Sequence, residues 1–163
     1  MIRILFICHG NICRSPMAEF VFRQKAAERG VSPLFSVSSA ATSTEEIWNG
    51  VGNPVYPPAQ RELKKHGITC DGKHAVQVTK ADYATYDYLL CMDGNNIPNL
   101  LRIIGSDPEG KVRRFMEPTA RGGDVADPWY TDRFDITYRD IEEGCEVWLD
   151  KLIPEAKKKG AES

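Results

Sequence analysis

Residues 2–16 read IRILFICHGNICRSP, a short apolar run followed by a polar loop and the beginning of a helix pattern. An apolar run of this length is typical of a strand that is buried on both faces of a parallel sheet. The run ends at Cys8, and the helix pattern opens almost at once, with Ser15 as its predicted N-cap and Pro16 suited to its first position. The stretch therefore predicts a strand, a tight loop and a helix in direct succession.

The loop that begins at Cys8 has the composition of an anion-binding cradle. Five residues separate Cys8 from Arg14, enough for backbone N–H groups to surround a phosphate, and Gly10 lets the backbone approach closely. The N-terminus of the following helix favours an anion, and the planar guanidinium of Arg14 can hold two phosphate oxygens. The pattern predicts Cys8 as the nucleophile of a phosphoryl transfer. The other predicted loop residues are His9, Gly10, Asn11, Ile12, Cys13 and Ser15.

An attacking cysteine must be a thiolate, and the same loop is expected to stabilise the negative sulfur. A helix dipole contributes only about 0.3–1 kcal/mol, whereas hydrogen bonds to charged groups contribute roughly 1.5–3 kcal/mol each. We therefore expect the backbone amides and the Ser15 hydroxyl to do more for Cys8 than the dipole does. The alternative interpretation is a buried structural cysteine with a solvated arginine, but the flanking strand and helix patterns favour the catalytic one.

The rest of the chain continues the alternation of strand and helix patterns. Such alternation predicts a small α/β domain, with a mostly parallel sheet covered by helices on both faces, over residues 1–163, of which 154–163 are expected to be a frayed tail. Ligands of such sheets bind where the strands end, so the expected loops at 40–58 and 117–133 should flank Cys8. The predicted strands are 35–39, 86–92 and 112–116, and the predicted helices are 59–66, 80–85 with Thr79 as cap, 97–104, and one from 134 onward.

The composition excludes several kinds of partner. The chain has 163 residues, 42% hydrophobic and 27% charged, and a formal net charge of -2, which offers no field for nucleic acid or for an anionic membrane. No segment has the pattern of a signal peptide or of a membrane span. Five cysteines without metal-binding spacing indicate free thiols and no zinc site. We therefore expect a cytoplasmic protein.

Four stretches resemble the low-molecular-weight protein tyrosine phosphatase family: CHGNICRSP at 8–16, SSAATS at 38–43, LCMD at 90–93 and DPWY at 127–130. The resemblance implies a four-stranded parallel sheet of order 2-1-3-4 with helices on both faces. It also implies that a phosphotyrosine-containing protein or a small aryl phosphate is hydrolysed to inorganic phosphate without a metal or cofactor. We expect the chain to be a monomer. The catalytic residues that it implies are Cys8 as nucleophile, Arg14 as phosphate binder and Asp127 as general acid.

The residues around Asp127 support the same role. Protonating a phenolate leaving group, with a pKa of about 10, should be worth about 10²–10⁴ in rate. Asp127 lies in a loop beside Pro128, which restricts its motion. Asp107 is also followed by proline, but its surroundings read as an ordinary turn. Three aromatic residues in the two flanking loops are predicted to form the walls that grip a phosphotyrosine ring: Trp48, Trp129 and Tyr130.

The resemblance implies supporting roles for other residues. Asn11, Ser39 and His74 match positions that hold the phosphate loop in shape through hydrogen bonds, and Asn11 tolerates the left-handed backbone that such a loop demands. A satisfied structural histidine is an equally good interpretation of His74. Cys13 lies close enough to Cys8 in sequence for a reversible disulfide, which would protect the nucleophile from overoxidation, with a small core residue as the alternative.

Three alternative functions stay open on the same motifs. Arginine phosphatases of this fold typically carry threonine where this chain has Ile12, whose larger apolar side chain favours a phenyl ring. Arsenate reductases of this fold need two further cysteines for a thiol relay, and Cys70 and Cys91 are far apart in the sequence. A non-catalytic phosphotyrosine-binding module would be expected to have lost Cys8, Arg14 or Asp127, and all three are present.

Overall fold

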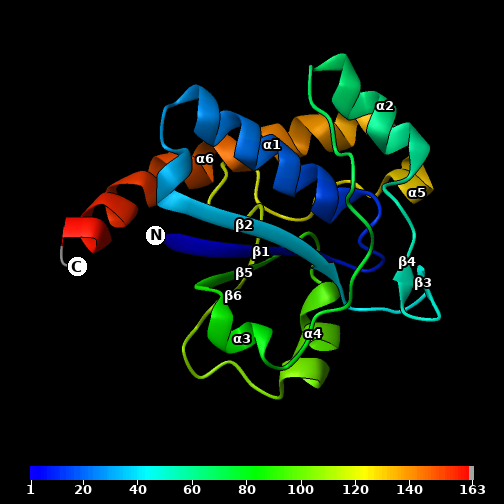
Figure 1. Ribbon diagram of the computed structural model, residues 1–163, viewed down its shortest axis with the longest axis horizontal. Helices are drawn as coiled ribbons and strands as arrows, with labels where there is room; N and C mark the ends of the chain where they lie inside the picture. The colour runs from blue at the N-terminus through cyan, green and yellow to red at the C-terminus, as the bar shows by residue number, and fades with distance from the viewer. Residues whose placement is uncertain (162–163) are drawn as a thin grey trace.

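The computed structural model describes residues 1–161, and these fold around one parallel sheet (Figure 1). Four strands lie in the order β2-β1-β5-β6, and every neighbouring pair is parallel. Counted along the chain, these four strands have the order 2-1-3-4, so the fold class that the sequence and the resemblance predicted is confirmed. The strands are β1 (Ile2–Cys8), β2 (Phe35–Ala41), β5 (Tyr88–Cys91) and β6 (Val112–Arg114).

Helices cover both faces of this sheet. On one face α1 (Arg14–Glu28) and α6 (Phe134–Ala161) pack together, with α2 (Pro57–Lys65) and α5 (Pro128–Thr131) beside them (Figure 1). On the other face lie α3 (Asp82–Thr85) and α4 (Asn96–Ile104). Side chains of β1 alternate between the two resulting cores. The first core receives Ile2, Ile4 and Phe6, and the second receives Leu5 and Ile7.

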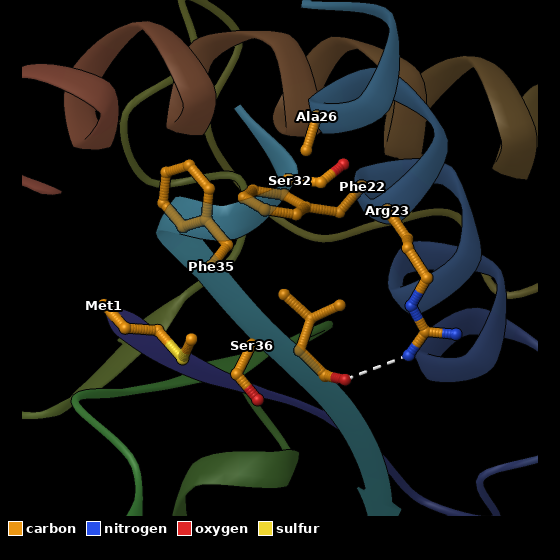
Figure 2. Close-up of a pocket in the computed structure, with 8 residues that line it drawn as sticks. Met1, Phe22, Arg23, Ala26, Ser32, Phe35 and Ser36 are labelled. Atoms are coloured by element: carbon orange, nitrogen blue, oxygen red, sulfur yellow. Dashed lines mark hydrogen bonds between the residues drawn. The ribbon is translucent and has the colours of Figure 1, made fainter. Parts of the chain in front are cut away.

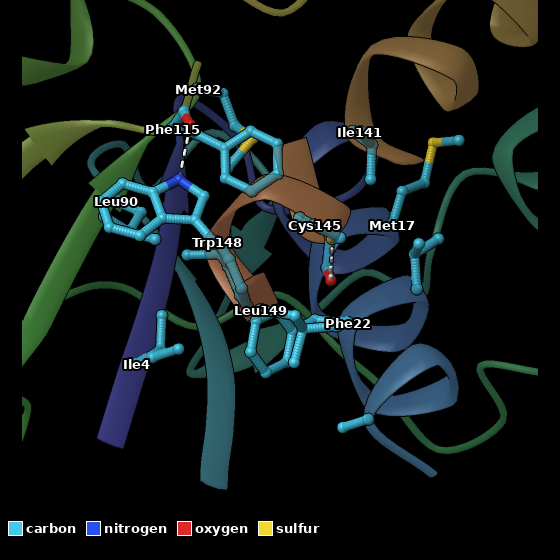
Figure 3. Close-up of a cluster of buried hydrophobic side chains, with 14 of the residues drawn as sticks. Ile4, Met17, Phe22, Leu90, Met92, Phe115, Ile141, Cys145, Trp148 and Leu149 are labelled. Carbon is cyan, nitrogen blue, oxygen red and sulfur yellow. Dashed lines mark hydrogen bonds between the residues drawn. The ribbon is translucent and has the colours of Figure 1, made fainter. Parts of the chain in front are cut away.

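The larger core is closed by α6, which packs on the sheet through aromatic residues (Figure 3). The fully buried Trp148 donates a hydrogen bond from Nε1 to the Phe115 carbonyl, over 2.6 Å. One helical turn earlier, the Phe115 ring occupies the space in front of Gly144, and a Cβ at that glycine would lie 2.2 Å from a ring carbon. Because only hydrogen fits there, Gly144 lets the helix approach the sheet closely.

The beginning of α1 differs from the prediction. The helix begins at Arg14 with Cys13 at the N-cap position, and no side chain caps it. The prediction that Ser15 is the N-cap was therefore wrong, because its side chain is drawn into the Cys8 loop instead. Thr79 was also wrong as a cap, since α3 begins only at Asp82, and the Thr79 N–H donates to the Asp82 carboxylate over 2.8 Å.

The two predicted loops contain short elements. Within 40–58, β3 (Ile47–Trp48) and β4 (Val51–Gly52) pair as a hairpin whose turn residues Asn49 and Gly50 have positive φ angles of 50° and 76°. An Asn-Gly pair is a strong hairpin signal, so the sequence did carry this element. Within 117–133, the single-turn α5 forms.

The predicted frayed tail, 154–163, is helical as far as the structure describes it. The helix α6 continues past Pro154 to Ala161, and the Ala156 side chain is fully buried. Residues 162–163 of that prediction lie outside the described residues. None of the helices in the described part of the chain combines the length and the apolar character that crossing a bilayer requires.

A surface hollow of about 330 Å³ lies at the amino end of β2, beside Phe22, Arg23 and Phe35 (Figure 2). Its one guanidinium, that of Arg23, is already bound to the Val37 carbonyl and to Glu19. Cys8 pairs in register with Ala41, at the opposite end of the strand. The hollow is therefore remote from the predicted chemistry, which lies at the carboxyl ends of the strands.

Candidate active site

The predicted site residues come together at the carboxyl edge of the sheet. Cys8 is the last residue of β1, and the loop that follows leads directly into α1. The β3–β4 hairpin and α5 lie at the same end of the molecule (Figure 1). Parallel strands that end together in this way create the usual ligand site of an open α/β sheet.

Two donors face the Cys8 sulfur. The backbone N–H of Asn11 lies 3.3 Å from Cys8 Sγ, and the Ser15 Oγ lies 3.0 Å from it. Ser15 Oγ also accepts a hydrogen bond from the Asn11 side-chain amide at 2.8 Å, which leaves its own proton free to point at the sulfur. Hydrogen bonds of this kind favour a negatively charged sulfur.

Asn11 anchors the loop from within. Its backbone has a φ of 60°, the left-handed conformation that its side chain tolerates, and the residue is buried. Its amide nitrogen donates to Ser15 and to Ser39 Oγ at 3.0 Å, and its amide oxygen accepts from the Val76 N–H at 3.1 Å. Both amide hydrogens and the amide oxygen of this side chain therefore help to fix the shape of the loop.

An ion pair between the buried Glu19 and the half-buried Lys73 lies behind this network and was missed by sequence reasoning. Ser39 donates to Glu19 Oε1 at 2.6 Å, and Lys73 Nζ lies 3.7 Å from the same carboxylate. Lys73 also donates to the Ser39 carbonyl at 2.8 Å. Burial lowers the pKa of Lys73, and the Glu19 carboxylate opposes this effect. The only sequence signal was a carboxylate within the apolar stretch of α1, between Met17 and Val21.

The side chain of His74 is exposed, and its Nδ1 lies 2.9 Å from the Gly52 carbonyl of the hairpin. This contact fits the interpretation of His74 as a satisfied structural histidine. Its loop-supporting role stays a prediction. Lys73, the residue before it, reaches the strand behind the loop.

Arg14 is held by two carboxylates. Its side chain is only 6% exposed, Nη1 donates to Asp93 Oδ2 at 2.8 Å and to the Val125 carbonyl at 3.3 Å, and Nη2 lies 3.6 Å from Asp127 Oδ2. Burial disfavours the cation, but the charges of Cys8, Asp127 and Asp93 together outweigh it and raise the pKa of Arg14. The guanidinium is thus permanently charged and fixed in orientation. Asp93 was not predicted, although it ends the LCMD motif.

Asp127 is positioned by its own short helix. It is the N-cap of α5, and its Oδ1 accepts the Trp129 N–H at 3.0 Å. The other oxygen, Oδ2, faces Arg14. One oxygen therefore anchors the carboxyl while the second lies beside the Arg14 guanidinium.

The three predicted ring-wall residues are strongly exposed. Trp48 lies on the hairpin, and Trp129 and Tyr130 lie on α5, with exposed fractions of 79%, 62% and 87%. The Trp129 ring packs against Tyr56, with centroids 5.3 Å apart. Tyr56 also donates its N–H to the Ile12 carbonyl at 2.9 Å, and so connects this wall to the phosphate loop. Sequence reasoning missed Tyr56, because a tyrosine before a Pro-Pro pair reads as ordinary loop packing.

The remaining residues of the Cys8 loop differ in how far they are exposed. His9 is exposed and pairs with Glu45 at 3.0 Å. Gly10 faces the Glu46 side chain, and Ile12 is nearly buried. Cys13 is partly exposed, and burial, reinforced by the charges of Cys8 and Asp127, raises the pKa of its thiol to about 12.

The other cysteines are inert thiols. Burial raises the pKa values of Cys70, Cys91 and Cys145, so these groups stay protonated at neutral pH. All five cysteines are free. Within residues 1–161 no cluster of three or more histidine, cysteine or acidic side chains has the arrangement of a metal site.

A family model for the low molecular weight phosphotyrosine protein phosphatases matches residues 3–159. The chain belongs to this family. The resemblance noted in the sequence is thereby confirmed, and with it the prediction of a cysteine-dependent phosphatase.

Individual members of this phosphatase family agree with the match along nearly the whole chain. The low molecular weight protein-tyrosine-phosphatase YfkJ of Bacillus subtilis is 37% identical, covering 95% of this chain and 98% of its own. The crystal structure of YfkJ superposes with a TM-score of 0.88 at 36% identity, covering 95% of this chain and 96% of that one. The structure of Vibrio vulnificus Wzb in complex with benzylphosphonate superposes with a TM-score of 0.80 at 28% identity, covering 93% of this chain and 99% of that one.

Proposed function

We propose that the chain hydrolyses phosphotyrosine through a phosphocysteine intermediate on Cys8, with Arg14 binding the phosphate and Asp127 as general acid and base. The observation that carries this proposal is the position of Arg14. Its buried guanidinium lies at the N-terminus of the helix that follows the Cys8 loop, and it faces Asp127 Oδ2 at 3.6 Å. A phosphate bound to Arg14 and to the loop amides therefore lies between the sulfur and the carboxyl.

In the first step the Cys8 thiolate attacks phosphorus in line with the bond to the tyrosine oxygen. The S–P bond forms while the P–O bond breaks, and Asp127 gives its proton to the departing oxygen. Asn11 N–H and Ser15 Oγ stabilise the sulfur before attack, and Arg14 holds the oxygens that carry the developing charge.

In the second step a water molecule attacks the phosphocysteine. Asp127, now ionised, takes a proton from the water as its oxygen bonds to phosphorus, and the S–P bond breaks. Inorganic phosphate leaves and the thiolate is restored. The groups of this chain account for both steps without a metal or a cofactor.

The aromatic rim supports a phenyl-bearing substrate. A phosphotyrosine ring can stack against Trp48, Trp129 and Tyr130 while its phosphate reaches the loop. The bound benzylphosphonate in Vibrio vulnificus Wzb joins a phenyl ring to a phosphonate in the same way. Ile12 in the loop favours this ring over the guanidinium of phosphoarginine. We propose that a monomer binds the protein substrate in the cytoplasm, where free thiols such as the five cysteines of this chain persist.

A panel of substrates tests the proposed specificity. Phenyl phosphate and a phosphotyrosine peptide should be hydrolysed, whereas phosphoserine and phosphoarginine peptides of the same sequence should be hydrolysed on the order of 10² times more slowly. Arsenate reduction in the presence of thiols should be undetectable. A higher kcat/KM for the phosphoarginine peptide than for the phosphotyrosine peptide would contradict the assignment, as would phosphotyrosine binding without turnover.

We propose in addition that Cys13 protects Cys8 during oxidation. Peroxide converts the Cys8 thiolate to a sulfenic acid, and the Cys13 sulfur then displaces water to form a disulfide that a dithiol reduces. Oxidation of Cys8 removes the negative charge that helps to hold the Cys13 thiol protonated.

After brief peroxide treatment, wild type should recover its activity with dithiothreitol, whereas Cys13→Ser should lose most of its activity permanently. Cys70→Ser is the matched control. Equal recovery of Cys13→Ser and wild type would rule this protection out.

A further inference from the structure

The segment that carries Asp127 is tied down along its backbone. The Val125 N–H donates to the Met92 carbonyl at 2.8 Å, just beyond β5, and the Val125 carbonyl accepts from Arg14. The segment is thereby joined on one side to the end of the sheet and to the phosphate-binding arginine. These bonds fix the approach to Asp127 from the direction of the sheet.

Ala126, the residue directly before Asp127, is held from the other side by α6. Its N–H donates to Asp140 Oδ2 at 3.0 Å, and its carbonyl accepts from Thr137 Oγ1 at 2.8 Å. Both side chains are buried, and they lie three residues apart, so they share one face of the helix. The second Asp140 oxygen pairs with Arg121 of the same loop at 3.0 Å.

A carboxylate in this place needs an explanation. Asp140 is 7% exposed on the helix face that packs into the protein, where burying a charge is costly unless it is paired and hydrogen-bonded. An apolar residue could fill the same space. The carboxylate is used instead to hold one backbone N–H and one loop guanidinium, and both belong to the loop that carries Asp127.

We propose that Asp140 and Thr137 are positioning residues for the general acid. They hold the backbone of Ala126 from two sides and thereby fix where the Asp127 carboxyl meets the leaving oxygen. The inference rests on the proposed function, in which Asp127 protonates that oxygen. Neither residue touches the reacting atoms, and their effect passes through Ala126.

The leaving group of the substrate separates this role from a purely structural one. A phenolate like that of tyrosine, with a pKa of about 10, needs the proton of Asp127 to depart. A 2,4-dinitrophenolate is stable enough to leave without one. A displaced Asp127 therefore lowers kcat/KM for phenyl phosphate and spares 2,4-dinitrophenyl phosphate, whereas a loss of folded enzyme lowers both by the same factor.

The test compares truncating and conservative variants on these two substrates. Asp140→Ala and Thr137→Val should lower kcat/KM for phenyl phosphate on the order of 10- to 10²-fold, the cost of misplacing a reacting group by about 1 Å. The values for 2,4-dinitrophenyl phosphate should stay within about threefold of wild type. Asp140→Asn and Thr137→Ser keep the groups that bind Ala126 and should recover most of the loss. Asp150→Ala removes an exposed carboxylate from the same helix, where it pairs with Arg29, and should change neither value.

Asp127→Asn, measured in parallel, separates the two possible failures. Suppose that Asp127→Asn lowers kcat/KM for phenyl phosphate much more than for 2,4-dinitrophenyl phosphate, while Asp140→Ala and Thr137→Val lower the two values equally or not at all. The inference is then overturned, and the proposed role of Asp127 stands. If Asp127→Asn lowers kcat/KM for the two substrates by the same factor, the assignment of Asp127 as the acid fails, and the inference fails with it. Should Asp140→Ala not fold, the Thr137→Val and Thr137→Ser pair decides alone. Inhibition by inorganic phosphate should be unchanged in the Asp140 and Thr137 variants, because these substitutions leave the phosphate loop and the charge of Asp127 in place.

Discussion

Cys8→Ser should abolish turnover of every aryl phosphate while leaving the fold intact. A serine hydroxyl fits the space of the thiol but stays protonated, and the groups that face it, Asn11 N–H and Ser15 Oγ, supply no base. The expected loss in kcat is on the order of 10⁶, as when the nucleophile of another covalent enzyme is removed. Initial rates with phenyl phosphate measure it.

The control for this variant is a second cysteine of the same loop. Cys13→Ser should retain turnover close to wild type under reducing conditions, since Cys13 takes no part in the chemical steps. Cys8→Ser should still bind inorganic phosphate in a calorimeter, because the loop amides and Arg14 remain. Turnover by Cys8→Ser at more than a trace of the wild-type rate would overturn the whole mechanism.

Asp127→Asn should lower kcat/KM for phenyl phosphate by about 10²–10⁴. The asparagine oxygen can still accept the Trp129 N–H, so the cap of α5 and the place of the loop are kept while the transferable proton is lost. Steady-state rates with phenyl phosphate and a nitro-substituted aryl phosphate measure the effect.

Asp132→Asn provides the matched control. Asp132 ends α5 in a left-handed conformation, with a φ of 55°, and asparagine adopts this conformation readily. The same change of charge at the other end of the same short helix should leave the rate within about threefold of wild type. An equal loss in the two variants would mean that charge near the site, rather than proton transfer, explains the effect.

The sequence predicted the parts of this molecule whose structure depends on residues close together in the chain. The run from Ile2 to Ile7 and the turn at Cys8 specify a strand followed by a loop, and the alternation of patterns specifies the layers. The order of the strands was implied by the family resemblance and not by any local pattern. The hairpin at Asn49 and Gly50 was missed although its turn signal is local.

The supporting residues of the site could not be predicted in the same way, because each depends on a contact between distant segments. Asp93 meets Arg14 across 79 positions, and Glu19 meets Ser39 across 20. In the sequence such carboxylates look like the solvated charges of any surface helix or loop. Only burial distinguishes them, and burial is a property of the folded chain. The contact of Asp140 with Ala126 is of the same kind.

Under the proposed role of Asp140, the contact between Gly144 and Phe115 links core packing to catalysis. Gly144 follows Asp140 by one helical turn, so the depth at which α6 settles on the Phe115 ring also sets how far Asp140 reaches toward Ala126. A methyl group added at that glycine would push the helix outward and carry the acid loop with it. With Asp140 in the proposed role, the missing side chain at Gly144 serves catalysis as well as stability, although Gly144 itself lies buried in the core.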